Sequence, residues 1–340
     1  MQILVTGGAG YVGSVLTPLL LGLGHRVRVL DSLIHGARSL LGVWSEPGFE
    51  LAHGDLRDRA LVERAVAGCD AVVHLAAVVG DPACARAPEL ARAVNFDASL
   101  ALIEASRRAR VERFVFASTC SNYGRMPDPA HYVDEESPLR PISLYAETKV
   151  AVEQALNALG SGAGICATPL RFATVYGVSP RMRFDLTVNE FTLALIADGR
   201  LAVYGEQFWR PYVHVRDVAR AVATVLAAPR DLVASQVFNV GSTDANYRKA
   251  DLVDLIRPLA PDATIEFVHR DEDPRDYRVS FARIRERLGF EASRSVPDGV
   301  AEVAALVRSG AMGDDQLQSL AKLRAKSPEE VRRYLAFIDF

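Results

Sequence analysis

The stretch ILVTGGAGYVG, residues 3–13, joins a short apolar run to a group of closely spaced glycines. Gly7, Gly10 and Gly13 follow the run QILVT (2–6) directly and lead into a helical pattern over about 11–23. Glycine permits a tight turn and lets backbone N–H groups approach a pyrophosphate, while the N-terminus of a helix favours negative charge. This order of strand, glycines and helix predicts a dinucleotide-binding loop that includes Tyr11 and Val12.

A carboxylate ends the second apolar run, RVRVLD (26–31), at Asp31. An acid at this place in a dinucleotide-binding unit accepts both hydroxyls of the adenosine ribose and repels a 2′-phosphate. Asp31 therefore favours NAD over NADP. Two alternatives stay open at this point: Asp31 could cap a turn instead, and Arg38 could accommodate a phosphate if its loop folds back.

Short apolar runs alternate with longer amphipathic stretches through the first half of the chain. Strands are expected at 2–6, 26–31, 49–55, 71–77, 113–119 and 164–172, and helices at about 11–23, 58–67, 88–109 and 144–158. Such alternation predicts an α/β fold with a doubly wound parallel sheet that is covered by helices on both faces.

The regular alternation of strands and helices ends after about residue 177. The elements expected there are a helix at 186–197, strands at 201–205, 237–241 and 265–269, a strand and helix over 212–228, a helix at 251–260, and one or two terminal helices over 314–340. We expect an NAD-binding domain over 1–177, to which 212–241 returns. A smaller α/β domain, formed mainly by 178–340, interleaves with it.

Composition narrows the class of protein. The 340 residues carry 39 Lys and Arg against 42 Asp and Glu, a formal charge of −3, which gives no indication of a nucleic-acid partner. The four cysteines (69, 84, 120 and 166) show no metal-ligand spacing, so no metal or disulfide framework is expected. With no basic leader and no apolar stretch of about 18 residues, the sequence predicts a cytoplasmic protein without a membrane span.

The stretch YAETK (145–149) places Tyr145 and Lys149 one helical turn apart, so both side chains project from one face. A neighbouring ammonium and a positive nicotinamide ring can lower the pKa of a phenol, which makes it a usable base. A surface pair could show the same spacing. The position of the helix, directly after the fifth strand, favours the catalytic interpretation because ligands bind at the carboxyl edge of such sheets.

Seven segments resemble, in the same order, the motifs of the extended short-chain dehydrogenase/reductase family, in its branch of nucleotide-sugar epimerases and dehydratases. They are TGGAGYVG (6–13), Asp31, GDLRD (54–58), HLAA (74–77), STCSNYG (118–124), YAETK and LRFATVYG (170–177). The resemblance extends from residue 2 to about 290. It implies an NAD-binding domain and a smaller C-terminal domain that binds a nucleotide diphosphate sugar.

The resemblance also implies roles for single residues. Tyr145 would remove a proton from a sugar hydroxyl, Lys149 would hold the nicotinamide ribose, and Thr119 would be the catalytic hydroxyl of STCSNYG rather than Ser118 or Ser121. For the cofactor, Asp55 and Leu56 would flank the adenine and Ala76 would line the pyrophosphate–ribose channel. Asn95 would either approach the active site or hold two helices together as a buried amide.

For the substrate, the resemblance selects Asn189, Arg210 and Arg275, from three separate segments, as contacts of the nucleotide diphosphate. Asp276 beside Arg275 belongs to the same segment. Pro211 stands where relatives usually carry an acid, so the contacts that bind the diphosphate are expected to differ in detail.

The residues after Thr119 bear on the reaction. Dehydratases of this kind carry an adjacent Asp-Glu pair there, because elimination of water needs an acid and a base. Cys120 and Ser121 stand there instead, which favours epimerisation at C4 through a transient 4-keto sugar. The alternatives are a dehydratase or oxidoreductase with a keto-sugar product, a C3 or C5 epimerase that works through an enolate, and a sensor that has lost catalysis; the intact Thr119, Tyr145 and Lys149 oppose the last.

Several roles stay open at this stage. Asp81 either binds a sugar hydroxyl or amine or caps the turn before Pro82. Cys120 either serves as an acid or base near the substrate or packs in the interior. Arg181 and Arg183 either meet an anionic sugar, such as a uronic acid, or lie on the surface. The helices at 88–109 and 144–158 occupy the positions through which relatives form homodimers.

Overall fold

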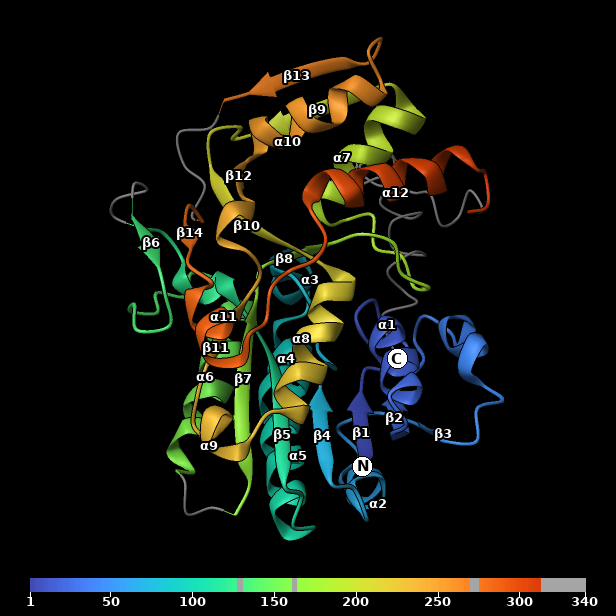
Figure 1. The fold of residues 1–340 in the computed structure, drawn as a ribbon, viewed down its shortest axis with the longest axis vertical. Helices are drawn as coiled ribbons and strands as arrows, with labels where there is room; N and C mark the ends of the chain where they lie inside the picture. Colours follow the sequence, from blue (N-terminus) through green and yellow to red (C-terminus); the bar gives the residue numbers. More distant parts are fainter. Residues whose placement is uncertain (127–130, 161–163, 270–274, 313–340) are drawn as a thin grey trace.

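The computed structural model describes residues 1–126, 131–160, 164–269 and 275–312. Figure 1 shows a large sheet flanked by helices, with a smaller group of strands and helices beyond one end of it. The terminal helices expected over 314–340 lie outside the described residues.

The large sheet has seven strands in the order β11-β7-β5-β4-β1-β2-β3, and every neighbouring pair is parallel. The strands are β1 (Gln2–Thr6), β2 (Arg26–Asp31), β3 (Phe49–His53), β4 (Ala71–His74), β5 (Arg113–Thr119), β7 (Cys166–Phe172) and β11 (Phe238–Val240). The predicted doubly wound α/β fold is confirmed. The carboxyl ends of all these strands point to the same edge, where the chain reverses its direction of winding between β1 and β4.

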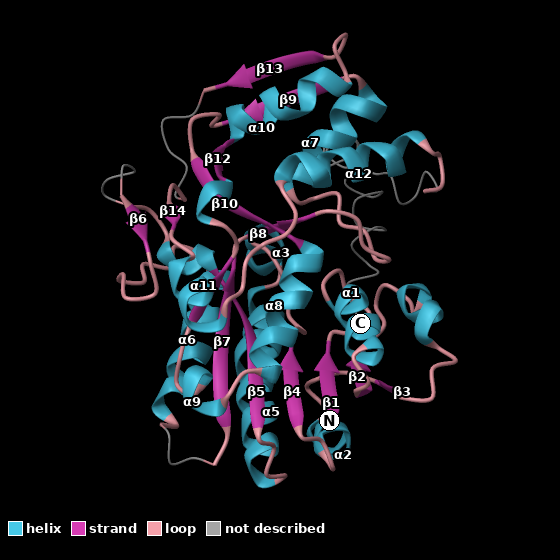
Figure 2. Cartoon of the chain, viewed as in Figure 1, coloured by secondary structure: helices cyan, strands magenta, loops and turns pink. Residues whose placement is uncertain are grey.

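Alternating side chains of the strands pack against helices on both faces of the sheet. On one face, Ile3 and Val5 belong to a core cluster with Leu16 of α1 (Gly13–Gly22) and Val218 of α8 (Val215–Ala227). On the other face, Leu4 packs in a cluster built by α2 (Arg59–Val66), α5 (Ala98–Arg108) and α6 (Leu144–Ala158). This two-sided burial explains why the strands are almost wholly apolar (Figure 2).

The helix expected over 88–109 is confirmed, with a π-helical turn inside it. Helix α4 (Pro88–Arg92) continues through the π turn η2 (Ala93–Asp97) into α5, and a separate short helix, α3 (Asp81–Arg86), precedes it. Asn95, in the π turn, binds the loop after β4. Its Oδ1 accepts from Val78 N at 2.7 Å and its Nδ2 donates to Val78 O at 2.9 Å. A π turn of this kind accommodates a side chain that bonds outside the helix.

The smaller lobe contains three small sheets. They are formed by β8 (Thr174–Tyr176), β10 (Trp209–His214) and β12 (Asn246–Arg248), by β9 (Arg200–Tyr204) with β13 (Thr264–Val268), and by β6 (Tyr132–Val133) with β14 (Arg278–Val279). Helices α7 (Thr187–Leu193), η5 (Ala194–Asp198), α10 (Lys249–Ile256) and α12 (Val296–Arg308) pack around a second core. Shorter helices are η1 (Arg38–Val43), η3 (Cys120–Tyr123), α9 (Arg230–Val233), η6 (Thr243–Ala245), η7 (Arg257–Leu259) and α11 (Ala282–Leu288).

Helix α12 is absent from the elements expected above, although the sequence carries its start signal. Ser295 and Asp298 form a capping box: Ser295 Oγ accepts from Asp298 N, and the Asp298 carboxylate accepts from Ser295 N at 2.8 Å. Within the described residues, no helix is both long and apolar enough to cross a membrane.

Candidate active site

The glycine-rich loop turns tightly where β1 meets α1. Gly7 has φ +73°, a left-handed conformation that favours glycine, and Gly10 N donates to Gly7 O at 3.1 Å. A Cβ atom at Gly7 would lie 2.8 Å from Ala76 N, and one at Gly13 would lie 2.3 Å from Gly7 O. Backbone therefore packs on backbone at this edge of the sheet. A side chain at either position would force this close turn open, so the two glycines allow the tight cradle that fits the pyrophosphate of a dinucleotide.

Asp31 lies beside this loop at the end of β2. Its Oδ2 accepts from Ala9 N at 2.9 Å and its Oδ1 accepts from Leu33 N at 2.8 Å. Each carboxylate oxygen has a second lone pair, so both can still accept from ligand hydroxyls. The arrangement fits an adenosine ribose, and the two backbone bonds fix the carboxylate relative to the glycine-rich loop.

The residues expected to flank the adenine, Asp55 and Leu56, follow β3, and Ala76, expected along the pyrophosphate–ribose channel, follows β4. Asp55 forms two side-chain hydrogen bonds with Arg57, at 3.0 and 2.7 Å, and these bonds hold the pKa of the Asp55 carboxyl below its usual value. Leu56 is buried among apolar side chains of the sheet, and Ala76 N donates to Thr6 Oγ1 at 3.3 Å. The structure thus brings Asp55, Leu56 and Ala76 to the same edge as Gly7.

The side chain of Tyr11 points toward the smaller lobe. Its hydroxyl donates to Gly177 O at 2.6 Å and accepts from Asn189 Nδ2 at 3.1 Å, while Asn189 Oδ1 accepts from Gly177 N at 2.9 Å. Asn189 is fully buried, and its Nδ2 also donates to Arg183 O. The prediction that Asn189 contacts the substrate needs correction, because both ends of its amide are engaged inside the protein. The residue joins the glycine-rich loop to the smaller lobe. Val12, beside Tyr11, is half-buried and packs against the core.

Thr119, Tyr145 and Lys149 come together from two adjacent elements. Thr119 ends β5, and its Oγ1 accepts from Ser121 N at 3.1 Å. Tyr145 lies in the first turn of α6, whose N-cap is Ser143. Lys149 Nζ donates to Ala117 O at 2.8 Å and lies 5.9 Å from the centre of the Tyr145 ring. Thr119 at the end of β5 and the Tyr145–Lys149 pair in the first part of α6 therefore lie on two elements that pack together at the carboxyl edge of the sheet.

Burial is the largest influence on the pKa values of Tyr145 and Lys149. It raises the pKa of Tyr145 well above its ordinary value and lowers the pKa of Lys149 from 10.5 to about 8. The positive charge of Arg183 opposes the rise at Tyr145, whereas Cys84 and Asp81 add to it. In the protein without cofactor, the ammonium of Lys149 does not offset the effect of burial on Tyr145. A phenolate at neutral pH needs further positive charge near the ring.

Cys120, one of the expected substrate contacts, lies in the interior. Its side chain belongs to the core cluster behind β5, its thiol donates to Arg171 O at 3.3 Å, and burial raises its pKa well above the ordinary value. The thiol packs on the core side of the turn, which opposes the predicted substrate contact of the Cys120 side chain. Ser121 is partly exposed and accepts from Tyr277 OH at 3.5 Å.

Asp81 bridges the catalytic helix and the smaller lobe. Its Oδ1 accepts from Ser143 Oγ at 2.7 Å, and its Oδ2 pairs with Arg275 Nη1 at 3.0 Å. Gly80, not Asp81, occupies the N-cap position of α3. The carboxylate therefore faces the space next to Tyr145, where a sugar would lie if Tyr145 acts on it.

Arg210 and Arg275 approach the same region from the smaller lobe. Arg210 is buried, donates to Trp209 O at 2.6 Å and stands 5.6 Å from the centre of the Tyr277 ring. Burial raises the pKa of Tyr277, and the charges of both arginines oppose that rise. The two predicted diphosphate contacts thus converge around one tyrosine. Pro211 lies within β10, paired with Asn246 of β12.

Arg183 is mostly buried and forms a bidentate ion pair with Asp185. Its Nε donates to Oδ1 at 3.0 Å, and its Nη2 donates to Oδ2. Burial raises the pKa of Tyr145 and of Tyr11, and the positive charge of Arg183 opposes both rises. Arg183 therefore faces the candidate site, not bulk solvent alone. Arg181 lies in the same segment and acts on Asp185.

Sequence reasoning missed Ser143, Glu153 and Arg171. Ser143 precedes the helix as a capping residue, Glu153 repeats the spacing of Tyr145 and Lys149 along α6, and Arg171 lies inside LRFATVYG. Helical spacing and capping rules could have found the first two.

Together, the doubly wound sheet, the glycine cradle and Asp31 define a dinucleotide-binding fold, and the Tyr145–Lys149 pair lies at the carboxyl edge of its sheet. The chain belongs to the NAD dependent epimerase/dehydratase family, whose family model matches residues 3–241. The resemblance drawn from the sequence is confirmed, and the cofactor of this family is NAD.

Among curated relatives, UDP-glucose 4-epimerase of Streptomyces lividans is 32% identical over 311 residues, covering 86% of this chain and 92% of that protein. dTDP-glucose 4,6-dehydratase of Streptomyces niveus is 31% identical over 332 residues, covering 94% and 96%. Among solved structures, the UDP-glucose 4-epimerase of Thermus thermophilus in complex with NAD gives a TM-score of 0.79 at 30% identity, covering 92% of this chain and all of that one. Identity at this level does not separate epimerase from dehydratase.

Proposed function

We propose that the protein is an NAD-dependent epimerase of a nucleotide diphosphate sugar and acts at C4. The observation that carries this proposal is the composition of the turn after β5. Thr119 is followed by a buried Cys120 and a neutral Ser121, so no carboxylic acid stands where elimination of water would need one. Oxidation and reduction at one carbon need only a single acid–base group, and Tyr145 supplies it.

Gly7, Gly10, Gly13 and Asp31 would hold the cofactor, because the loop and the carboxylate fit a pyrophosphate and a ribose. Lys149 would bind the nicotinamide ribose. When bound, NAD supplies an acceptor for the hydride that leaves C4 of the sugar, and its positive charge favours the phenolate of Tyr145.

Tyr145 Oη takes the proton of the C4 hydroxyl, and Thr119 Oγ1 orients that hydroxyl from the end of β5. The 4-keto sugar would then turn and present its opposite face, so that the hydride returns to C4 on that face while Tyr145 returns the proton to the C4 oxygen. Arg210 and Arg275 hold the diphosphate throughout, so the sugar turns while the nucleotide stays fixed. Asp81 can contact sugar hydroxyls beside Tyr145.

A 4,6-dehydratase is the second candidate, and one observation favours it: Asp81 places a carboxylate close to Tyr145. Its carboxylate is already paired with Arg275, and it lies in the first turn of α3, not beside Thr119 in the chain. An enolate route to C3 or C5 epimers with Cys120 as the acid or base is disfavoured, since the Cys120 thiol packs in the core.

The proposal is tested by incubating the purified protein, with its NAD content measured first, with UDP-glucose, dTDP-glucose and UDP-glucuronic acid in separate reactions. NMR spectra of the products should show the C4 epimer of one of them and no net formation of NADH. Accumulation of a 4-keto-6-deoxy sugar would contradict the proposal in favour of a dehydratase. Release of NADH with an oxidised sugar would indicate an oxidoreductase.

We also propose that the enzyme works as a cytoplasmic homodimer. Helices α5 and α6 pack against each other on one face of the sheet, and they are the elements through which the resemblance predicts pairing. Sedimentation equilibrium of the NAD-loaded protein should give twice the chain mass of 37.0 kDa.

A further inference from the structure

A buried ion pair lies directly behind the catalytic residues. Glu153 sits one helical turn after Lys149 and two turns after Tyr145, on the same face of α6. Arg171 of β7 pairs with it through Nη2, which donates to Oε2 at 2.7 Å, and through Nε, which donates to Oε1 at 3.1 Å. Both side chains are at most 5% exposed.

Glu153 also binds the turn that carries Thr119. Its Oε1 accepts from Ser118 Oγ and, at 3.0 Å, from Asn122 Nδ2, which also donates to Ser118 Oγ at 3.1 Å. Lys149, one turn earlier, holds Ala117 O. Helix α6 is therefore hydrogen-bonded to β5 at Ala117 and Ser118, the two residues that directly precede Thr119.

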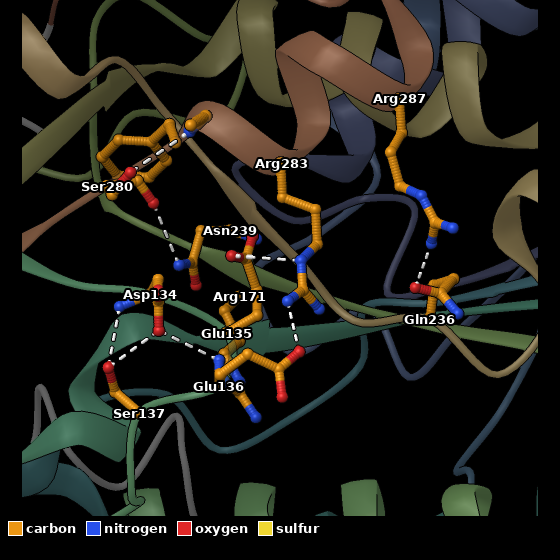
Figure 3. A network of polar contacts seen from close by, with 12 residues as sticks. Asp134, Glu135, Glu136, Ser137, Arg171, Gln236, Asn239, Ser280, Arg283 and Arg287 are labelled. Atoms are coloured by element: carbon orange, nitrogen blue, oxygen red, sulfur yellow. Dashed lines mark hydrogen bonds and ion pairs between the residues drawn. The ribbon is translucent and has the colours of Figure 1, made fainter.

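Arg171 is anchored in turn from the far edge of the sheet. Its Nη1 donates to the Tyr123 hydroxyl at 2.9 Å, and that hydroxyl donates to Asn239 Oδ1 at 2.8 Å. Asn239 N donates to Glu135 Oε1 at 2.7 Å, and Arg283 lies against Glu135. Figure 3 shows this outer end, where side chains from β7, β11 and α11 meet the segment around Glu135.

A buried ion pair is a weak source of stability, since apolar side chains of similar volume hold a helix on a sheet equally well or better. Its hydrogen bonds, however, fix one geometry, which apolar packing does less sharply. We infer that Glu153 is a positioning residue: through Ser118 and Asn122 it fixes Thr119 relative to Tyr145 and Lys149, and Arg171 fixes Glu153. This inference rests on the proposed function of Thr119, Tyr145 and Lys149.

The same placement affects the charge of Lys149. The groups facing Lys149 are Glu153 on its own helix, Cys84 on α3, His74 on β4 and Tyr145. Burial lowers the pKa of His74 to about 3 and raises that of Cys84 to about 11, so both are neutral at pH 7. Burial lowers the pKa of Lys149, and Cys84 and Glu153 oppose that fall; of these two, Glu153 carries a carboxylate.

The test uses Glu153→Gln in the NAD-loaded protein, with Glu147→Gln as the matched control, because Glu147 is exposed on the same helix. For Glu153→Gln we expect kcat on the sugar that the wild type epimerises to fall about 100-fold while KM changes little, as for a misplaced catalytic group. The pKa of Lys149, followed by NMR of ¹³C-labelled lysine and assigned with Lys149→Arg, should fall. Glu147→Gln should leave both unchanged. Unchanged kcat and unchanged titration of Lys149 in folded Glu153→Gln would overturn the inference.

Two further variants keep the test independent of folding defects. Ser118→Ala removes one link and leaves the ion pair in place, and it should also lower kcat. The double variant Glu153→Met with Arg171→Met should recover thermal stability relative to Glu153→Gln but not kcat. Recovery of kcat together with stability would show a merely structural pair and refute the inference.

The Lys149 titration is measured without turnover. If the wild type transforms no nucleotide sugar, the proposed function fails, but a lowered Lys149 pKa in Glu153→Gln still supports the link between Glu153 and Lys149, and an unchanged pKa rejects it.

Discussion

Arg275 of the smaller lobe forms an ion pair with Asp81 at 3.0 Å, next to the first turn of the catalytic helix. Asp81 in turn holds Ser143, the N-cap residue of α6, and Tyr145 follows two positions later. A candidate diphosphate contact is therefore linked through one carboxylate to the helix that carries the candidate base. Binding of a nucleotide sugar at Arg275 and the position of Tyr145 should be coupled.

Asp81→Asn tests this coupling. The amide oxygen can still accept from Ser143, but Arg275 loses its charged partner, so KM for the nucleotide sugar should rise about fivefold, the equivalent of about 1 kcal/mol. The melting temperature should change little, since the pair is partly exposed. Glu63→Gln, which breaks the exposed pair between Glu63 and Arg108, is the control and should alter neither quantity. An unchanged KM in Asp81→Asn would reject the coupling.

Gly13→Ala should abolish retention of NAD during purification. Its added Cβ would lie 2.3 Å from Gly7 O, so the glycine-rich loop would have to open. Gly22→Ala, at the other end of α1, meets nothing within 4 Å and should be neutral or stabilise the protein by up to about 1 kcal/mol. NAD content by absorbance and melting temperature check both variants. Normal NAD retention in Gly13→Ala would contradict the placement of the cofactor.

Tyr145→Phe should lower kcat by at least about 100-fold, because the phenylalanine ring cannot take or return the proton of the sugar hydroxyl. The protein should still fold and retain NAD, since no hydrogen bond of the Tyr145 hydroxyl holds the described structure together. Steady-state kinetics and NAD content separate the two effects. Residual activity close to that of the wild type would remove Tyr145 from the mechanism.

Lys149→Met should raise stability at neutral pH. The pKa of Lys149 in the folded protein is about 8, below the ordinary value of 10.5, so the charged form is disfavoured on folding. Between these pH values the unfolded chain binds more protons, and wild-type stability therefore rises with pH. The advantage of Lys149→Met, on the order of 3 kcal/mol below pH 8, should shrink toward pH 10.5. Denaturant unfolding over this range measures it, and a constant difference would contradict the burial of a charged amine.

Much of the fold could be predicted because its signals are local. The run of Ile3, Leu4 and Val5 ahead of Gly7 determines a buried strand and a tight turn without help from distant residues. The π turn around Asn95 could not be predicted, since the partner of its side chain, Val78, lies in the loop after β4.

The residues of the candidate site also divide into those that the sequence could predict and those that it could not. Tyr145 and Lys149 share a helix, so their spacing in the sequence already places them on one face. Asn189 and Cys120 were assigned from their positions in motifs, but side-chain direction depends on tertiary packing: one amide turned toward Tyr11 and Gly177, and one thiol turned into the core. Glu153 and Arg171 lie on the consecutive elements α6 and β7, and their side chains meet because α6 packs back against the sheet, which the sequence pattern alone does not show.

The most direct test of the central claim is the fate of a label at C4. The NAD-loaded enzyme is supplied with a nucleotide sugar that carries deuterium at C4, chosen from the substrate that it transforms, in ordinary water. Epimerisation by oxidation and reduction at one carbon predicts a C4 epimer that keeps its deuterium at C4. Loss of the label to solvent, or its transfer to C6 of a 4-keto-6-deoxy sugar, would contradict the account.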